Sequence, residues 1–200
     1  MNFPTQLVED AVTEIAKLPG IGKKTAMRLA LHLLKATEET TVDLASALVN
    51  LRTKTQYCKQ CHHISESDLC NICSSHRRDE SVICVVEDSR NILAIEDTHQ
   101  YNGFYHVLGG IISPMAGVGP DELNISSLVE RANEKQVQEI VLAISPTMEG
   151  DTTAFYLSKK LADCQVKITS IARGVPIGGE LEYADSLTLG RSIITRTTYS

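Results

Sequence analysis

Hydrophobic residues recur at helical spacing three times near the start of the chain. Residues 5–17 predict a first helix, which Pro19 ends. Residues 23–35 predict a second helix, and the segment from about Thr41 predicts a third. The side chains expected to face inward are Val8, Ala11, Val12, Ile15, Ala26, Leu29, Ala30, Leu33, Leu34, Leu44, Leu48 and Leu51. This pattern predicts a small helical region over residues 1–53, which is marginal as a free-standing unit.

From residue 81 onward, short and wholly apolar runs alternate with helical segments. The predicted strands are residues 81–87, 104–110, 139–145 and 166–172, and the predicted helices are residues 89–97, 126–136 and 151–163. Strands that are apolar on both faces indicate a parallel sheet covered by helices on both sides. The predicted fold class is therefore α/β with several modules: a helical N-terminal region, a small cysteine-rich module, a parallel α/β sheet and a short C-terminal segment.

Composition and charge narrow the class of protein. Hydrophobic residues make up 42% of the chain and charged residues 22%, and the formal net charge is −6. No apolar run reaches the roughly 18 residues that a membrane span needs. The N-terminus lacks the charged-then-apolar pattern of a signal peptide, so we expect a cytoplasmic protein. An acidic chain is not coated in positive charge, and any contact with nucleic acid must be local.

One segment runs against this acidic balance. Between Glu14 and Glu38 every charged residue is basic, and a Gly-Ile-Gly turn leads into the second helix. Lys23 and Lys24 stand at the N-terminus of that helix, where a cation opposes the helix dipole by a few tenths of a kcal/mol. A phosphate bound at this helix N-terminus would attract both lysines, so that they would stabilise the bound state instead. The alternative is an ordinary helical hairpin with a solvated basic face.

The pattern hydrophobe-Gly-Ile-Gly-Lys resembles a helix-hairpin-helix, a module that grips the nucleic-acid backbone without reading bases. Contacts of this kind are sensitive to salt and independent of sequence. Lys24 and Arg28 also share one helical stripe with His32 and Lys35. Lys23, Lys24 and Arg28 are therefore the predicted DNA-binding residues.

Residues 54–77 are polar and cysteine-rich and cannot form a hydrophobic core. Two Cys-x-x-Cys pairs with eight residues between them supply four thiolates, the ligand set of a closed tetrahedral Zn²⁺ site. The predicted ligands are Cys58, Cys61, Cys70 and Cys73. Unliganded thiols or disulfides are the alternative. We expect His62, His63 and His76 at the surface, and Cys84 and Cys164 as small packing residues.

Three acidic residues follow the predicted strands. Glu87 ends the first strand, and Glu149 and Asp151 come between the third strand and the helix after it. Sites in open parallel sheets form beyond the carboxyl ends of strands, so these acids should gather at one edge if the two strands are neighbours. Clustered carboxylates can hold Mg²⁺ for phosphoryl chemistry. Alternatively they are hydrated helix caps, with Asp151 or Thr152 as the N-cap.

With these acids the sheet resembles a Toprim domain, and the order of modules resembles the RecR family of bacterial recombination mediators over essentially the whole chain. The stretches that carry the resemblance are LPGIGKKTAMRLA, the four-cysteine block, VVED, YHVLGG, EGDTTAFYL and RGVPIGGELEYAD. The expected boundaries are 1–53 for the helix-hairpin-helix, 54–77 for the zinc finger, 78–173 for the Toprim domain and 174–200 for the C-terminal segment.

The resemblance implies a recombinational repair factor without catalytic activity, present in the cytoplasm at the nucleoid. It implies ring-shaped tetramers around single- or double-stranded DNA, which bind RecO or RecF. Such rings help to load RecA on strands coated by single-strand-binding protein. The family associates the Toprim acids with partner contact, which makes Glu87, Glu149 and Asp151 the expected partner-binding residues. Catalytic Toprim enzymes carry Asp-x-Asp where this chain has Glu149-Gly-Asp151, which weakens an enzymatic interpretation.

Two other functions compete with a DNA-binding mediator. The first is a Mg²⁺-dependent nuclease, primase or topoisomerase-like enzyme that uses the three acids. The second is a zinc-based protein-interaction module that meets DNA only through partners.

The stretch LEYAD at 181–185 is compared in this family with a Walker B strand, and the C-terminal segment is an expected oligomer contact. The chain has no Gly-x4-Gly-Lys-Ser/Thr sequence, so ATP binding has little support.

Overall fold

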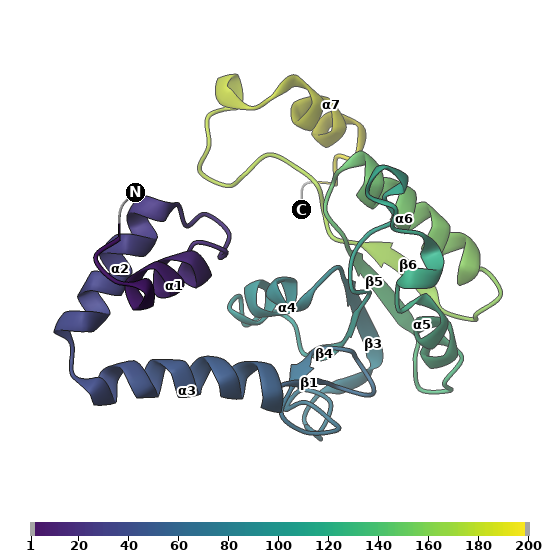
Figure 1. The fold of residues 1–200 in the computed structure, drawn as a ribbon. Helices are drawn as coiled ribbons and strands as arrows, with labels where there is room; N and C mark the ends of the chain where they lie inside the picture. Colours follow the sequence, from purple (N-terminus) through teal and green to yellow (C-terminus); the bar gives the residue numbers. More distant parts are fainter. Residues whose placement is uncertain (1–2, 199–200) are drawn as a thin grey trace. The chain divides into compact units, whose positions relative to one another are not determined.

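The structure, a computed structural model, describes residues 3–198 and divides into two compact units on either side of Thr55 (Figure 1). The first unit holds three α-helices. The second holds a two-stranded hairpin, a four-stranded sheet, the helices packed on it and the C-terminal segment. No described helix is both long and apolar enough to cross a bilayer.

In the first unit, α1 (Gln6–Ile15) and α2 (Lys23–Lys35) pack against each other. Their shared core consists of Val8 and Val12 from α1 and Ala26 and Ala30 from α2. The two alanines are small, so the helix backbones can approach closely, and each helix buries only one narrow stripe. This small core holds the turn between the helices in place.

The leucines of this unit lie outside that core. Leu29 and Leu34 on α2 are exposed, as is Ala11 on α1, so the prediction that these residues face inward was wrong. α3 (Glu38–Lys54) begins after the N-cap Thr37 and buries none of its residues. Its predicted apolar face is uncovered: Leu44, Leu48 and Leu51 are 46%, 58% and 64% exposed. Helical periodicity identified the apolar stripe, but it does not say what covers the stripe.

In the second unit, four strands form a wholly parallel sheet in the order β4-β3-β5-β6, which confirms the predicted α/β class. The strands are β3 (Asp79–Val86), β4 (Gly103–Val107), β5 (Glu139–Ala143) and β6 (Lys167–Ser170). The chain leaves β3 toward β4 on one side and returns to β5 on the other. The carboxyl ends of β3 and β5 therefore form the switch point at which open α/β sheets bind ligands or partners.

Helices cover both faces of the sheet. On one face Val85 packs with Leu128 of α5 (Ile125–Ala132) and Leu157 of α6 (Met148–Lys160). On the other face Val86 packs with Ile92 of α4 (Ser89–Glu96). Neighbouring residues of one strand thus point to opposite faces, as the pleat requires. Cys84 and Cys164 are buried, as predicted.

Several helix boundaries differ from the predictions, and two of them lie near the acidic residues or the sheet core. α5 ends at Ala132, four residues earlier than expected, and α6 begins at Met148, three residues earlier. The N-cap of α6 is Thr147, whose Oγ1 accepts a hydrogen bond from the Gly150 N–H at 3.0 Å. The expected caps, Asp151 and Thr152, therefore lie inside the helix. This shift places the acidic pair of α6 in its first turn.

The remaining elements are short. β1 (Gln56–Tyr57) and β2 (Ile64–Ser65) form the antiparallel hairpin of the cysteine-rich module. The 3₁₀ helices are η1 (Pro114–Ala116), η2 (Pro120–Glu122) and η3 (Leu181–Tyr183), and the last helix is α7 (Ser186–Ile194).

We predict that Gly150→Ala destabilises the second unit. A Cβ at this position would lie 2.0 Å from the backbone oxygen of Ser145, which no side-chain rotation can relieve. The expected loss is about 3 kcal/mol of unfolding free energy, measured by urea denaturation. Gly190→Ala is the matched control, because a Cβ there meets nothing within 4 Å. It should be neutral or stabilise by about 1 kcal/mol or less. Equal stability of the two variants would contradict this packing.

Candidate functional site

The turn between α1 and α2 is shaped for close approach by another molecule. Gly20 has a φ of +78°, a conformation that favours glycine. A Cβ on Gly20 or Gly22 would meet nothing within 4 Å, so the space beside the turn is open. Gly22 is the N-cap of α2 and has no side chain to accept from the first-turn N–H groups. Those N–H groups and the positive end of the helix dipole are therefore available to an anion.

Basic side chains extend this anion-binding end along α2. Lys23, Lys24 and Arg28 are all exposed. None lies within 4.0 Å of a carboxylate oxygen in the described part of the chain, so their charge is not neutralised locally. Lys24 and Arg28 line one surface hollow with His32 and Lys35, as the helical stripe predicts. Lys23 does not line this hollow and stands at the turn instead.

The four predicted zinc ligands come together in the second unit. The Sγ atoms of Cys58, Cys61, Cys70 and Cys73 all lie within 4.8 Å of one another, and three of the four residues are buried. Backbone turns position the first pair: the N–H of Cys58 donates to the carbonyl of His63 at 2.8 Å, and the N–H of His62 donates to the carbonyl of Cys58 at 2.9 Å. The N–H of Cys73 donates to the Sγ of Cys70 at 3.5 Å.

The donor set fits a structural Zn²⁺. Tetrahedral Zn–S bonds of about 2.3 Å separate the sulfurs by roughly 3.8 Å, and the Sγ atoms of Cys61 and Cys70 are 3.5 Å apart. The hydrogen bond with Cys70 and burial raise the pKa of the Cys61 thiol above its ordinary value. A metal ion lowers the pKa of such thiols and binds them as thiolates. Four protein ligands leave no open coordination position, so this is a structural zinc site.

The zinc module is joined to the edge of the large sheet. The N–H of Val107, in edge strand β4, donates to the carbonyl of Cys61 at 2.8 Å. The Nε2 of His62 lies 2.9 Å from the Oγ of Ser127, and its ring meets His106 edge-on with 5.2 Å between centroids. The sequence placed His62 at the surface, but the side chain is half-buried. Burial, with the nearby Arg131 charge, lowers the pKa of His62.

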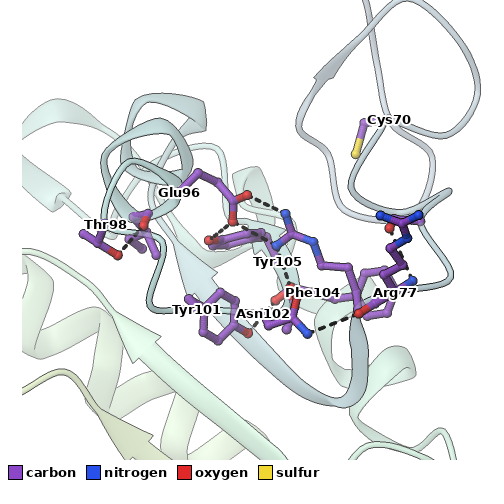
Figure 2. A network of polar contacts seen from close by, with 12 residues as sticks. Cys70, Arg77, Glu96, Thr98, Tyr101, Asn102, Phe104 and Tyr105 are labelled. Atoms are coloured by element: carbon purple, nitrogen blue, oxygen red, sulfur yellow. Dashed lines mark hydrogen bonds and ion pairs between the residues drawn. The ribbon is translucent and has the colours of Figure 1, made fainter.

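A second set of polar contacts fixes the chain where it leaves the module (Figure 2). Arg78 forms an ion pair with Glu96 of α4, and the Oη of Tyr105 donates to the same carboxylate at 2.6 Å. The Nδ2 of Asn102 donates to the carbonyl of Arg77 at 3.1 Å. The hydrogen bond from Arg78 holds the pKa of Glu96 below its usual value. These contacts tie the exit of the zinc module to β4 and α4.

The three acids follow β3 and β5, but each has different partners. The Oε1 of Glu87 accepts from the Ser145 N–H at 2.6 Å. Asp151 lies between two arginines: its Oδ1 is 2.6 Å from Arg173, and its Oδ2 is 3.4 Å from Arg191. Hydrogen bonding from Arg173 is the main cause that lowers the pKa of Asp151. Glu149 has no ion-pair partner among residues 3–198.

The carboxylates therefore do not converge on one point. In the described part of the chain, the four cysteines are the only group of three or more metal-binding side chains whose ligand atoms lie within 4.8 Å of one another. A divalent cation at Asp151 would have to displace two guanidinium groups. Sequence reasoning did not connect Arg173 and Arg191 with Asp151, because each stands far from Asp151 along the chain. Arg173 opens the stretch RGVPIGGELEYAD, but nothing in that stretch indicates its partner.

Known families match the modules in the same order. Family models described as the RecR helix-hairpin-helix, the RecR four-cysteine zinc finger domain, the Toprim domain and the RecR C-terminal region match residues 8–52, 55–75, 81–172 and 174–197. The chain is 60% identical to the recombination protein RecR of Cytophaga hutchinsonii, over 100% of this chain and 98% of that protein. It is 54% and 55% identical to the RecR proteins of Porphyromonas gingivalis and Phocaeicola vulgatus, over 100% of this chain and 96% and 97% of theirs.

We predict that Cys61→Ser loses the metal. The wild-type protein should hold about one zinc per chain by elemental analysis, and the variant should hold almost none and melt at a lower temperature. Cys164→Ser is the matched control: it removes a buried thiol outside the four-cysteine group and should keep the zinc. Zinc retained at full stoichiometry in Cys61→Ser would exclude this cysteine as a ligand.

Proposed function

This chain belongs to the RecR family of recombination proteins, and we propose that it is a non-enzymatic DNA-binding mediator of recombinational repair. The observation that carries the proposal is the α1–α2 hairpin. It presents exposed basic side chains that have no ion-pair partner within residues 3–198, and a free helix N-terminus, in a chain whose formal net charge is −6. Positive charge concentrated at one turn of an acidic protein indicates a specific anionic ligand.

The proposed ligand is the phosphate backbone of DNA. The first-turn N–H groups of α2 bind phosphate oxygens, and Lys23, Lys24 and Arg28 neutralise neighbouring phosphates. These contacts read no bases, so they suit single and double strands of any sequence. They release counterions, so affinity falls steeply with salt.

Several copies of the hairpin act together on one DNA molecule. One small patch on an acidic subunit binds weakly, and a ring-shaped tetramer multiplies the effective affinity by holding several patches on the same strand. The uncovered leucines of the first unit, including Leu34, Leu48 and Leu51, supply apolar surface for contacts between copies. The C-terminal segment is a second proposed contact between subunits.

The acidic edge of the sheet is the proposed partner surface. Glu87, Glu149 and Asp151 follow the two strands that form the switch point, where α/β sheets present their binding sites. A basic surface of RecO or RecF docks there, in the cytoplasm at the nucleoid. Docking brings the DNA-bound ring to strands coated by single-strand-binding protein, where RecA is loaded.

A Mg²⁺-dependent Toprim enzyme is the less favoured alternative. Such an enzyme needs several carboxylates directed at one ion. Here Glu87 accepts from a backbone N–H, and Asp151 is paired with two arginines. The same arrangement suits a protein-binding surface. The carboxylate of Asp151 already accepts guanidinium groups, and a basic partner presents groups of the same kind.

We predict that Lys23→Glu with Arg28→Glu removes most DNA binding and leaves the fold intact. Reversing two phosphate-contacting charges should weaken binding roughly a hundredfold in fluorescence anisotropy and reduce its dependence on salt. Arg52→Glu with Lys54→Glu makes the same change of charge on α3 and is the control. If the hairpin variant binds single and double strands as wild type does at low salt, the DNA-binding proposal fails.

We predict that Glu149→Lys weakens binding of RecO or RecF at least about tenfold, because it places a cation where a basic partner docks. Isothermal titration calorimetry with each purified partner measures the effect and shows which partner uses this surface. Glu130→Lys on α5 changes an acid elsewhere in the same unit and is the control. DNA binding should be unchanged in both variants. Undiminished affinity of Glu149→Lys for both partners would rule out the acidic edge.

A further inference from the structure

A surface hollow of about 470 Å³ separates the zinc module from the carboxyl end of β4 and the start of α4. Tyr57 of β1 and Ile64 of β2 form its apolar wall on the zinc module. The two residues are direct partners in the hairpin, so their side chains share one face. They are 70% and 51% exposed, although both side chains are large and mainly apolar. Ligand pockets in proteins typically measure about 300 to 1,000 Å³, so the hollow has the size of a binding site.

Hydrogen bonds hold the walls of this hollow in place. The N–H of Ile64 donates to the Oγ of Ser89 at 3.4 Å, which joins the zinc hairpin to the start of α4. The N–H of Gly109, which follows β4, donates to the carbonyl of Glu87 at 3.0 Å. Ser89 and Gly109 both line the hollow. The hollow is therefore formed before anything binds, and a ligand does not have to order its walls.

The hollow is continuous with the acidic edge. Asp88, which lines it, follows Glu87 directly in the chain, and Gly109 is hydrogen-bonded to the Glu87 backbone. The carboxylate of Asp88 pairs with Arg90, whose side chain is 89% exposed. Ion pairs this exposed contribute little stability, so an incoming cation can share the Asp88 carboxylate. An apolar wall beside carboxylates suits a ligand that carries an apolar group next to a positive charge.

We propose that this hollow is an anchor pocket for the basic partner of the acidic edge: one aliphatic or aromatic side chain of the partner packs against Tyr57 and Ile64, and a neighbouring basic residue pairs with Asp88. The inference rests on the proposed function of the acidic edge and adds the apolar contact that carboxylates cannot supply. In protein interfaces a few buried side chains carry most of the affinity, while charges mainly set the rate and orientation of docking. The zinc module thus provides one wall of the partner's binding site.

A base of single-stranded DNA is the other occupant that an exposed tyrosine can stack on. The charges argue against it. Glu87 and Asp88 place two carboxylates beside the hollow, where they would repel the phosphates of the same strand. Arg90, the arginine that lines the hollow, is already paired with Asp88. This surface therefore favours a basic protein over a polynucleotide.

The first test measures the apolar anchor, with purified RecO and RecF as the probes. Tyr57→Ala and Ile64→Ala should each weaken the binding of one partner at least about tenfold in isothermal titration calorimetry, because each truncation removes part of the wall. Leu69→Ala is the matched control: Leu69 is 43% exposed in the same module and does not line the hollow. All three variants should keep about one zinc per chain, since none of these residues belongs to the four-cysteine group. If Tyr57→Ala and Ile64→Ala bind both partners as tightly as Leu69→Ala does, the anchor pocket is refuted.

The second test separates this inference from the proposed function of the edge. If Glu149→Lys loses partner binding while Tyr57→Ala and Ile64→Ala keep it, the acidic edge stands and the anchor pocket fails. If Tyr57→Ala and Ile64→Ala lose partner binding while Glu149→Lys keeps it, the pocket is supported and the acidic edge fails. Fluorescence anisotropy with single- and double-stranded DNA tests the other occupant. Affinity for single strands that falls in Tyr57→Ala, with partner binding unchanged, would identify a base in the hollow and overturn the proposal.

Discussion

Coordination of one metal ion by four thiolates holds together a segment that has no hydrophobic core of its own. Residues 56–77 are largely polar, and their buried cluster consists of the cysteines themselves. The metal fixes the turn at Cys61, and the Cys61 carbonyl then pairs with edge strand β4. The orientation of this segment depends on these four bonds, together with the Arg78–Glu96 ion pair where the chain continues into β3.

Charge is distributed so that different parts of the chain present opposite signs. The first unit gathers unpaired cations at one helix N-terminus, and the second places carboxylates beyond the ends of its central strands. Each set lies where the backbone already favours its ligand: free N–H groups at the helix start, and a switch point at the sheet edge. A subunit that carries one small basic patch would gain affinity for a long anionic ligand by repetition, as in the proposed ring.

Periodicity and spacing predicted much of this molecule. The wholly apolar strands indicated a parallel sheet, and the two Cys-x-x-Cys pairs identified the ligand set, because both depend on residues close in sequence. Contacts between distant residues were not predictable. Asp151 pairs with Arg173 and Arg191, and His62 packs on His106, only after the chain has folded. Periodicity likewise marked the apolar face of α3 without showing that its own unit leaves it uncovered.

The hydrogen bond between the Cys61 carbonyl and the Val107 N–H has a consequence for solubility. A bare edge strand is a template on which other chains can add strands, and natural proteins cover or shorten such edges. Here the cover is held by thiolates, which oxidation converts to species that no longer bind metal. Loss of the metal by oxidation would thus free the Val107 N–H at the end of β4 for pairing with another chain, which favours aggregation.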